Sequence, residues 1–97
     1  MIIIIQFVNM EKNSSAETLA KEKLESLKVK FDDIIRAEVF FKEEKADVEK
    51  GKICEIRLSL PGPRIHASSN ESSFHAATAE TMRDLERQLD KRKNNLA

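Results

Sequence analysis

The sequence has few of the residues that form disulfides, zinc sites or turns, and no apolar run long enough to span a membrane. Its 97 residues include one cysteine, two glycines, two prolines and no tryptophan or tyrosine. The lone Cys54 cannot form an internal disulfide, and no cysteine and histidine cluster has zinc-ligand spacing, so we expect neither covalent nor metal staples. The longest apolar run, residues 1–5, is too short to cross a membrane, and no basic residue precedes it as in a signal peptide. We therefore expect a cytoplasmic protein that carries no cofactor and contacts no membrane.

An excess of charge of one sign is also missing. Seventeen lysines and arginines balance seventeen aspartates and glutamates, so the formal net charge is zero. Any attraction to a polyanion must therefore come from the way the charges are arranged on the surface. The length excludes a two-domain enzyme with its own cofactor fold, and we expect residues 1–97 to form a single domain.

Hydrophobic periodicity predicts how the chain begins. Residues 2–8 are apolar on both alternating faces and rich in β-branched side chains, which is typical of a strand covered on both sides. Ser14 and Glu17 fit a capping box, in which each side chain accepts a hydrogen bond from the other residue's backbone N–H. Apolar residues at helical spacing follow, so we predict a helix over residues 15–30.

Alternating and helical patterns divide the rest of the chain. A period of two predicts three strands, at residues 35–42, 53–60 and 64–69. In the first of these strands, Ile35 is expected to face inward. A Pro-Gly-Pro turn separates the last two strands. Helical spacing then predicts a helix from residue 72 to the C-terminus, with Leu96 as a further apolar position on its inner face.

The predicted order β-α-β-β-β-α indicates an α+β fold. Each helix has one apolar stripe, so we expect both helices to pack on the same face of a four-stranded mixed sheet. A right-handed crossover makes the first two strands parallel, and an antiparallel meander follows. The opposite face is expected to be open, except for partial cover over the first strand, which is apolar on both sides.

Signals for catalysis are weak. Cys54 lies on the inward face of its strand, which favours a packed, inert thiol over a nucleophile. His66 is either a solvated side chain or a contact to backbone or phosphate. Asp32 and Asp33 follow the first helix directly and suit a turn better than acid/base chemistry. Because no nucleophile, base and orienting group come together, we do not expect an enzyme.

The last helix carries a more informative pattern. Arg83, Arg87 and Lys91 recur every four residues, and Arg92 and Lys93 extend the basic end. Like charges at this spacing cost an isolated helix roughly 0.2 to 0.5 kcal/mol per pair, a penalty that phosphates would reverse. The other interpretation is an ordinary solvated face, because four acids lie within pairing distance: Glu80, Asp84, Glu86 and Asp90. The pattern alone does not decide between them.

Motifs along almost the whole chain resemble the ribosome hibernation promoting factor and ribosome-associated inhibitor family, also called the sigma modulation protein family. They are Lys30-Phe31-Asp32, Glu55-Ile56-Arg57-Leu58, Pro61-Gly62, Ile65-His66-Ala67 and Arg87-Gln88-Leu89-x-Lys91-x-Lys93. The family's fold is β-α-β-β-β-α, like a double-stranded-RNA-binding domain with an added first strand. The chain departs from the family's Asp-Lys before the helical leucine, where it has Arg83-Asp84, which moves a basic residue by about 100° around the helix.

The resemblance implies ribosome hibernation rather than catalysis. Members bind the small ribosomal subunit between head and body, over the messenger and the A- and P-site transfer-RNA positions, and so block translation in slow growth or stress. Carried over by position, ribosomal RNA contacts are expected from the ends of both helices: Arg83, Arg87, Lys91, Arg92, Lys93, Lys28 and Lys30. We expect a short, single-domain form that is monomeric in solution and does not bind DNA.

Two other functions stay open at this point. A double-stranded-RNA-binding module acting away from the ribosome would use the same basic helix. A protein-interaction module would instead use the open sheet face with Phe40 and Arg57.

Overall fold

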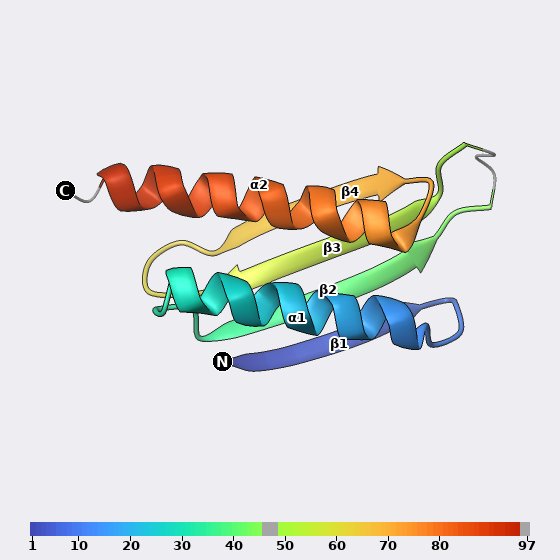
Figure 1. The fold of residues 1–97 in the computed structure, drawn as a ribbon, viewed down its shortest axis with the longest axis horizontal. Helices are drawn as coiled ribbons and strands as arrows, with labels where there is room; N and C mark the ends of the chain where they lie inside the picture. Colours follow the sequence, from blue (N-terminus) through green and yellow to red (C-terminus); the bar gives the residue numbers. More distant parts are fainter. Residues whose placement is uncertain (46–48, 96–97) are drawn as a thin grey trace.

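The secondary structure follows the predicted order. The elements are β1 (Ile2–Val8), α1 (Ser14–Lys30), β2 (Arg36–Glu43), β3 (Lys52–Ser59), β4 (Ile65–Glu71) and α2 (Phe74–Asn95). The computed structural model describes residues 1–45 and 49–95, and the expected apolar position Leu96 lies outside them. Both helices pack against one face of a single sheet (Figure 1). The predicted α+β fold is confirmed.

The sheet has the expected mixed topology. Its strands lie in the order β1-β2-β3-β4. β1 pairs with β2 in parallel, whereas β2 with β3 and β3 with β4 are antiparallel. This register aligns Ile5, Val39, Ile56 and Ala67 in one row across the sheet, and all four pack into or against the core beneath the helices.

Phe41 is the largest fully buried side chain. Its ring stacks on Phe7 of β1, with ring centroids 5.3 Å apart, and meets the edge of Phe74 of α2 at 5.5 Å. Leu24 of α1 and Leu85 of α2 are also fully buried. The core therefore joins strands and helices from both ends of the sequence.

The prediction that Ile35 faces inward is wrong. Its side chain is 58% exposed, while Ile34, which the alternation omitted, is 1% exposed and belongs to the core. β2 begins only at Arg36. Before it, the Ile35 backbone bridges two strands, because its N–H donates to Ser59 O and its carbonyl accepts from Ile2 N–H. The strand alternation therefore starts one residue later than the sequence pattern suggested.

The predicted capping box at Ser14 and Glu17 is also wrong. Asn13 is the N-cap of α1, and its side chain accepts a hydrogen bond of 3.0 Å from the backbone N–H of Ala16. Helix α1 begins at Ser14, so Ser14 already lies inside the first turn. The Glu17 carboxylate pairs instead with Lys12 and Lys21.

Replacing Asn13 by Ala is expected to lower the free energy of unfolding by about 0.5–2 kcal/mol, since an N–H at the helix start loses its acceptor. Ser14→Ala is the matched control and is expected to change stability by less than about 0.5 kcal/mol. Urea denaturation of both variants measures the difference. Equal losses, or a larger loss for Ser14→Ala, would contradict the observed cap.

The sheet face opposite the helices is open among the described residues. Ile2 is 58% exposed there, and Ile4 and Val8 are half-buried. The partial cover expected over β1 is not provided by any helix or strand of residues 1–45 and 49–95 (Figure 1). The helical face and this open face are therefore two separate candidate surfaces for binding.

Candidate nucleic-acid interface

The C-terminal half of α2 carries basic side chains that have no internal partner. Arg87, Lys91 and Lys93 are exposed, and none of them makes a hydrogen bond or ion pair with the rest of the described chain. The buried residues Leu85 and Leu89 fix the inner side of the helix. With about 100° per residue, Arg87 points outward and Lys91 and Lys93 occupy opposite flanks. We call these three residues the free basic end of α2.

Three of the four acids near this end are engaged elsewhere, and the fourth, Asp90, is exposed and makes no hydrogen bond or ion pair with the described residues. The Glu86 carboxylate pairs with Lys30 of α1 at 2.5 Å, and Glu80 pairs with Arg83. The Asp84 carboxylate accepts from the Gln88 side-chain amide at 3.2 Å. Asp90 alone of these four acids therefore remains beside Arg87, Lys91 and Lys93, so the bases outnumber the acids at this end, which favours a polyanion site over a solvated face with matched charges.

Arg92 is bound within the fold, unlike Lys91 and Lys93 on either side of it. Its guanidinium donates to the carbonyl of Pro63 at 2.8 Å and to the carbonyl of Pro61. Both carbonyls lie in the turn between β3 and β4. The structure therefore places Arg92 between α2 and this turn, with two of its five N–H donors bound to the turn, rather than at the free edge where the sequence suggested an RNA contact.

The basic residues expected on α1 also have partners. Lys28 Nζ donates to the carbonyls of Asp32 and Ile34. These bonds hold the chain as it leaves the helix. Lys30 is paired with Glu86, and the hydrogen bond to this carboxylate raises the pKa of Lys30. Sequence reasoning could not foresee this pair, because its members are 56 residues apart.

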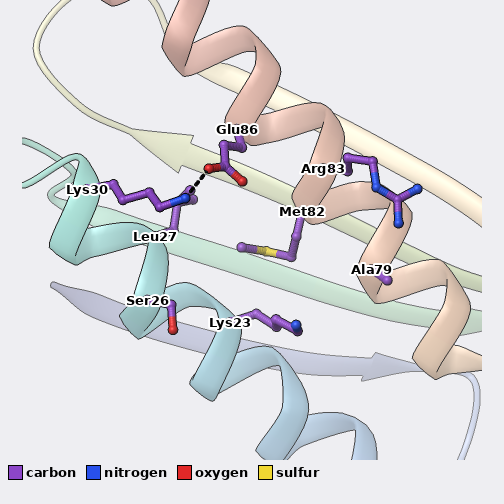
Figure 2. Close-up of a pocket in the computed structure, with 8 residues that line it drawn as sticks. All are labelled: Lys23, Ser26, Leu27, Lys30, Ala79, Met82, Arg83 and Glu86. Atoms are coloured by element: carbon purple, nitrogen blue, oxygen red, sulfur yellow. Dashed lines mark hydrogen bonds and ion pairs between the residues drawn. The ribbon is translucent and has the colours of Figure 1, made fainter.

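A groove separates α1 from α2. Its volume is about 310 Å³, and it is lined by Lys23, Ser26, Leu27, Lys30, Ala79, Met82, Arg83 and Glu86. Figure 2 shows Lys23 and Lys30 projecting from α1 opposite Arg83 and Glu86 of α2. Lys23 is exposed and was not among the expected contacts. Its spacing of seven residues from Lys30 is the signal that could have placed both on one side of the helix.

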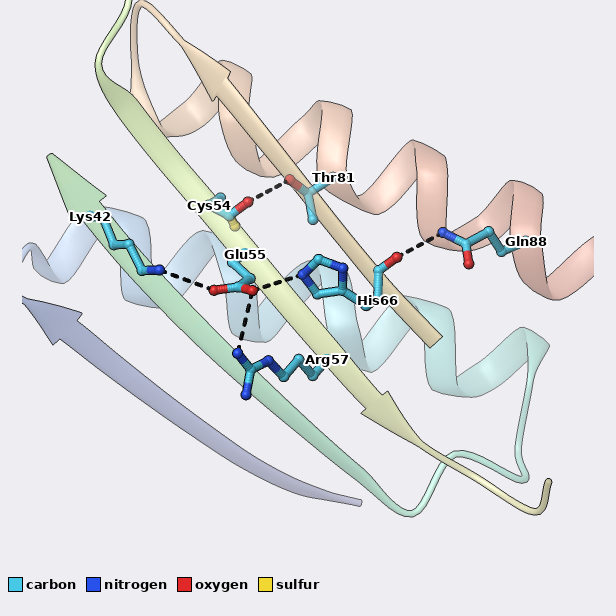
Figure 3. A network of polar contacts seen from close by, with 7 residues as sticks. All are labelled: Lys42, Cys54, Glu55, Arg57, His66, Thr81 and Gln88. Atoms are coloured by element: carbon cyan, nitrogen blue, oxygen red, sulfur yellow. Dashed lines mark hydrogen bonds and ion pairs between the residues drawn. The ribbon is translucent and has the colours of Figure 1, made fainter. Parts of the chain in front are cut away.

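The open face of the sheet carries a charge network centred on Glu55. Its carboxylate binds His66 Nε2 at 2.7 Å and Lys42 Nζ at 3.2 Å, with Arg57 at 3.6 Å (Figure 3). Burial raises the pKa of Glu55, but the contacts to His66 and Lys42 outweigh it and leave the pKa lowered. Each of these basic side chains therefore contacts a carboxylate, whereas Arg87, Lys91 and Lys93 contact none among the described residues.

Phe40 and Arg57, which the sequence suggested as an interaction surface on the open face, contact each other. The Arg57 guanidinium lies over the Phe40 ring, 5.0 Å from its centroid. This cation–π contact occupies the aromatic face that a protein-interaction module would offer to a partner. His66, whose role the sequence left open, is half-exposed and bound to Glu55.

Cys54 is buried beneath α2, where the Thr81 hydroxyl donates to its backbone carbonyl at 3.0 Å (Figure 3). Burial raises the pKa of its thiol to about 11. We therefore expect no reaction with a disulfide reagent in the native protein at pH 8 and complete reaction after denaturation, because only the exposed thiolate attacks. Absorbance of the released thiol measures both states. Rapid modification of the folded protein would contradict the buried position.

The described residues contain neither a metal-binding cluster nor a membrane-spanning helix. In this part of the chain, no group of three His, Cys, Asp or Glu side chains is placed to hold a metal ion. No helix within residues 1–45 and 49–95 is both long and apolar enough to span a bilayer.

The fold and this surface define a small α+β protein whose second helix ends in free basic side chains. A model of the family described as sigma 54 modulation protein / S30EA ribosomal protein matches residues 3–97, so the chain belongs to that family. The resemblance inferred from the sequence motifs is confirmed. No curated protein sequence matches the chain.

Two solved structures are similar to this one. A ribosomal subunit interface protein from Coxiella burnetii is 26% identical, with a TM-score of 0.86, and the match covers 97% of this chain and 99% of that one. The N-terminal domain of Protein Y from Thermus thermophilus is 22% identical, with a TM-score of 0.76, over 94% of this chain and 98% of that one. The second likeness shows the fold alone.

Proposed function

We propose that the protein binds the RNA of the small ribosomal subunit and blocks translation in slow growth or stress. In this proposal residues 1–97 act as one ribosome-binding domain, as a monomer in the cytoplasm and without catalysis. Two findings support this proposal. The chain belongs to a family whose description includes a ribosomal protein, and its structure is similar to that of a ribosomal subunit interface protein.

The observation that carries the proposal is the free basic end of α2. In a chain of zero net charge, Arg87, Lys91 and Lys93 make no ion pair with the described residues, while three of the four nearby acids bind other groups. Arginine can place two hydrogen bonds on one phosphate, whereas lysine acts as a mobile point charge. Arg87 is therefore expected to fix the position of the helix on RNA, and the two lysines to add attraction.

Inhibition in this proposal is steric. A domain held between the head and body of the small subunit, over the messenger and the A- and P-site positions, excludes both RNAs by occupying their place. Structured RNA suits such binding, because its backbone and shape can be recognised without reading the sequence. Catalytic residues are not needed, which agrees with the buried and protonated state of Cys54.

Competition between purified small subunits and a free RNA duplex tests the proposal. A labelled protein bound to small subunits is expected to stay bound when duplex is added at equal phosphate concentration. It is also expected to inhibit translation of a messenger in a purified system. Transfer to the duplex would favour an RNA-binding module acting away from the ribosome, and binding to neither would overturn the proposal.

A further inference from the structure

The turn between β3 and β4 is held against α2 by Arg92. The guanidinium binds the carbonyls of Pro61 and Pro63, which flank Gly62. Gly62 has a φ of +93°, and a Cβ at this position would collide with Arg92 Nη2. Glycine is thus required here both for the backbone conformation and for the close approach of the arginine.

A cavity of about 820 Å³ lies between this turn and α2. We call it the turn cup, and its lining residues are Pro61, Gly62, Pro63, Arg64, Ile65, Gln88, Lys91 and Arg92. Prolines and Ile65 give it apolar walls. Arg64 and Lys91 are exposed, and neither has a hydrogen bond or ion pair to the described residues. The cup therefore combines apolar walls with two unneutralised cations.

This combination matches the chemistry of a nucleotide. A phosphate can bind Arg64 and Lys91, while the base and ribose of an unstacked nucleotide can pack against apolar walls. Lys91 also belongs to the free basic end of α2, so the cup is continuous with the surface proposed to contact RNA.

We propose that the turn cup receives one unpaired nucleotide of the bound RNA, with Arg64 and Lys91 on its phosphate and Arg92 as a positioning residue. This inference rests on the proposed binding to the small subunit. It assigns a role to Arg64, which sequence reasoning had not placed among the RNA contacts. It also explains why Arg92 differs from its basic neighbours, since its donors keep the turn in place.

The test measures the affinity of small subunits for two double variants, and then for Arg92→Ala alone and in a triple variant, all at 0.1 M salt. Arg64→Ala with Lys91→Ala is expected to lose about 5- to 8-fold in affinity, because the one phosphate held in the cup loses both of its cations. Lys12→Ala with Lys21→Ala removes the same charge from the other end of the helical face and is expected to bind like the wild type. Equal losses of affinity in the two double variants would contradict the proposed nucleotide site in the turn cup.

Arg92→Ala distinguishes positioning from simple charge. Alone, it is expected to weaken binding; added to the Arg64→Ala and Lys91→Ala pair, it is expected to have no further effect, because the site it positions is already lost. A full additional loss in the triple variant would show that Arg92 acts independently and would overturn its assigned role. Circular dichroism confirms that each variant is folded.

Two controls separate the possible failures. If the wild type does not bind small subunits, the proposed function fails and the cup fails with it; if the wild type binds but the cup pair matches its control, the cup and the RNA contact of Lys91 fail, while binding to the small subunit stands. Titration of the wild type with AMP tests the other source of a nucleotide. Saturable AMP binding that needs Arg64 would make the cup a mononucleotide site and overturn the RNA assignment.

Discussion

Simultaneous replacement of Arg87, Lys91 and Lys93 by Glu is expected to abolish co-sedimentation with small ribosomal subunits. The three side chains are exposed and make no hydrogen bond or ion pair with residues 1–45 and 49–95, so their replacement removes attraction without breaking a contact within this part of the fold. Loss of three phosphate contacts at 0.1 M salt corresponds to at least about a 100-fold loss of affinity, before the repulsion by three new carboxylates is added. Sucrose-gradient sedimentation with purified subunits measures the result.

A matched variant controls for net charge. Lys12→Glu, Lys21→Glu and Arg36→Glu change the formal charge by the same amount away from α2, since Lys12 precedes α1, Lys21 lies in α1 and Arg36 lies at the start of β2. Each of these cations is exposed and pairs with a half-buried carboxylate, Glu17 or Glu38, and surface pairs of this kind contribute only about 0–1 kcal/mol. The control is therefore expected to fold and to sediment with subunits. Equal binding by both variants, or equal loss, would refute the specific role of the α2 end.

Phe41→Ala is expected to lower the free energy of unfolding by about 3–5 kcal/mol. The ring is fully buried and contacts both Phe7 and Phe74, so its removal opens a cavity between β1, β2 and α2. Phe40→Ala, one residue earlier on the open face, is the control. Its half-buried ring should cost clearly less. Guanidinium denaturation measures both, and a larger loss for Phe40 would contradict the assignment of the two sheet faces.

Most of the fold could be predicted from the sequence, because its strands and helices have clear apolar periods. The errors lie where an element begins. Two neighbouring isoleucines, Ile34 and Ile35, offered two possible starts for the alternation, and only the backbone bonds of Ile35 to β1 and β3 decide which one faces inward. At α1, Asn13 and Ser14 both suit a helix start, and the position of the first turn decides between them.

The candidate site was less predictable, because a charge is available only if no other group binds it. The sequence correctly placed Arg87 and Lys91 on the outer part of α2. It could not show that Lys30 is bound by Glu86, or that Arg92 reaches the turn at Pro61 and Pro63. These contacts join residues far apart in the chain. For the same reason Arg64, which precedes β4, gave no sign that it lines the same surface depression as Lys91.

The dependence of small-subunit binding on salt tests the central claim most directly. For the wild type and for the variant carrying Arg87→Ala, Lys91→Ala and Lys93→Ala, the logarithm of the binding constant is measured against the logarithm of salt concentration. If these three side chains each neutralise an RNA phosphate, the slope is expected to become shallower by about 2 to 3 in the variant. An unchanged slope would show that the free basic end of α2 does not touch the ribosomal RNA.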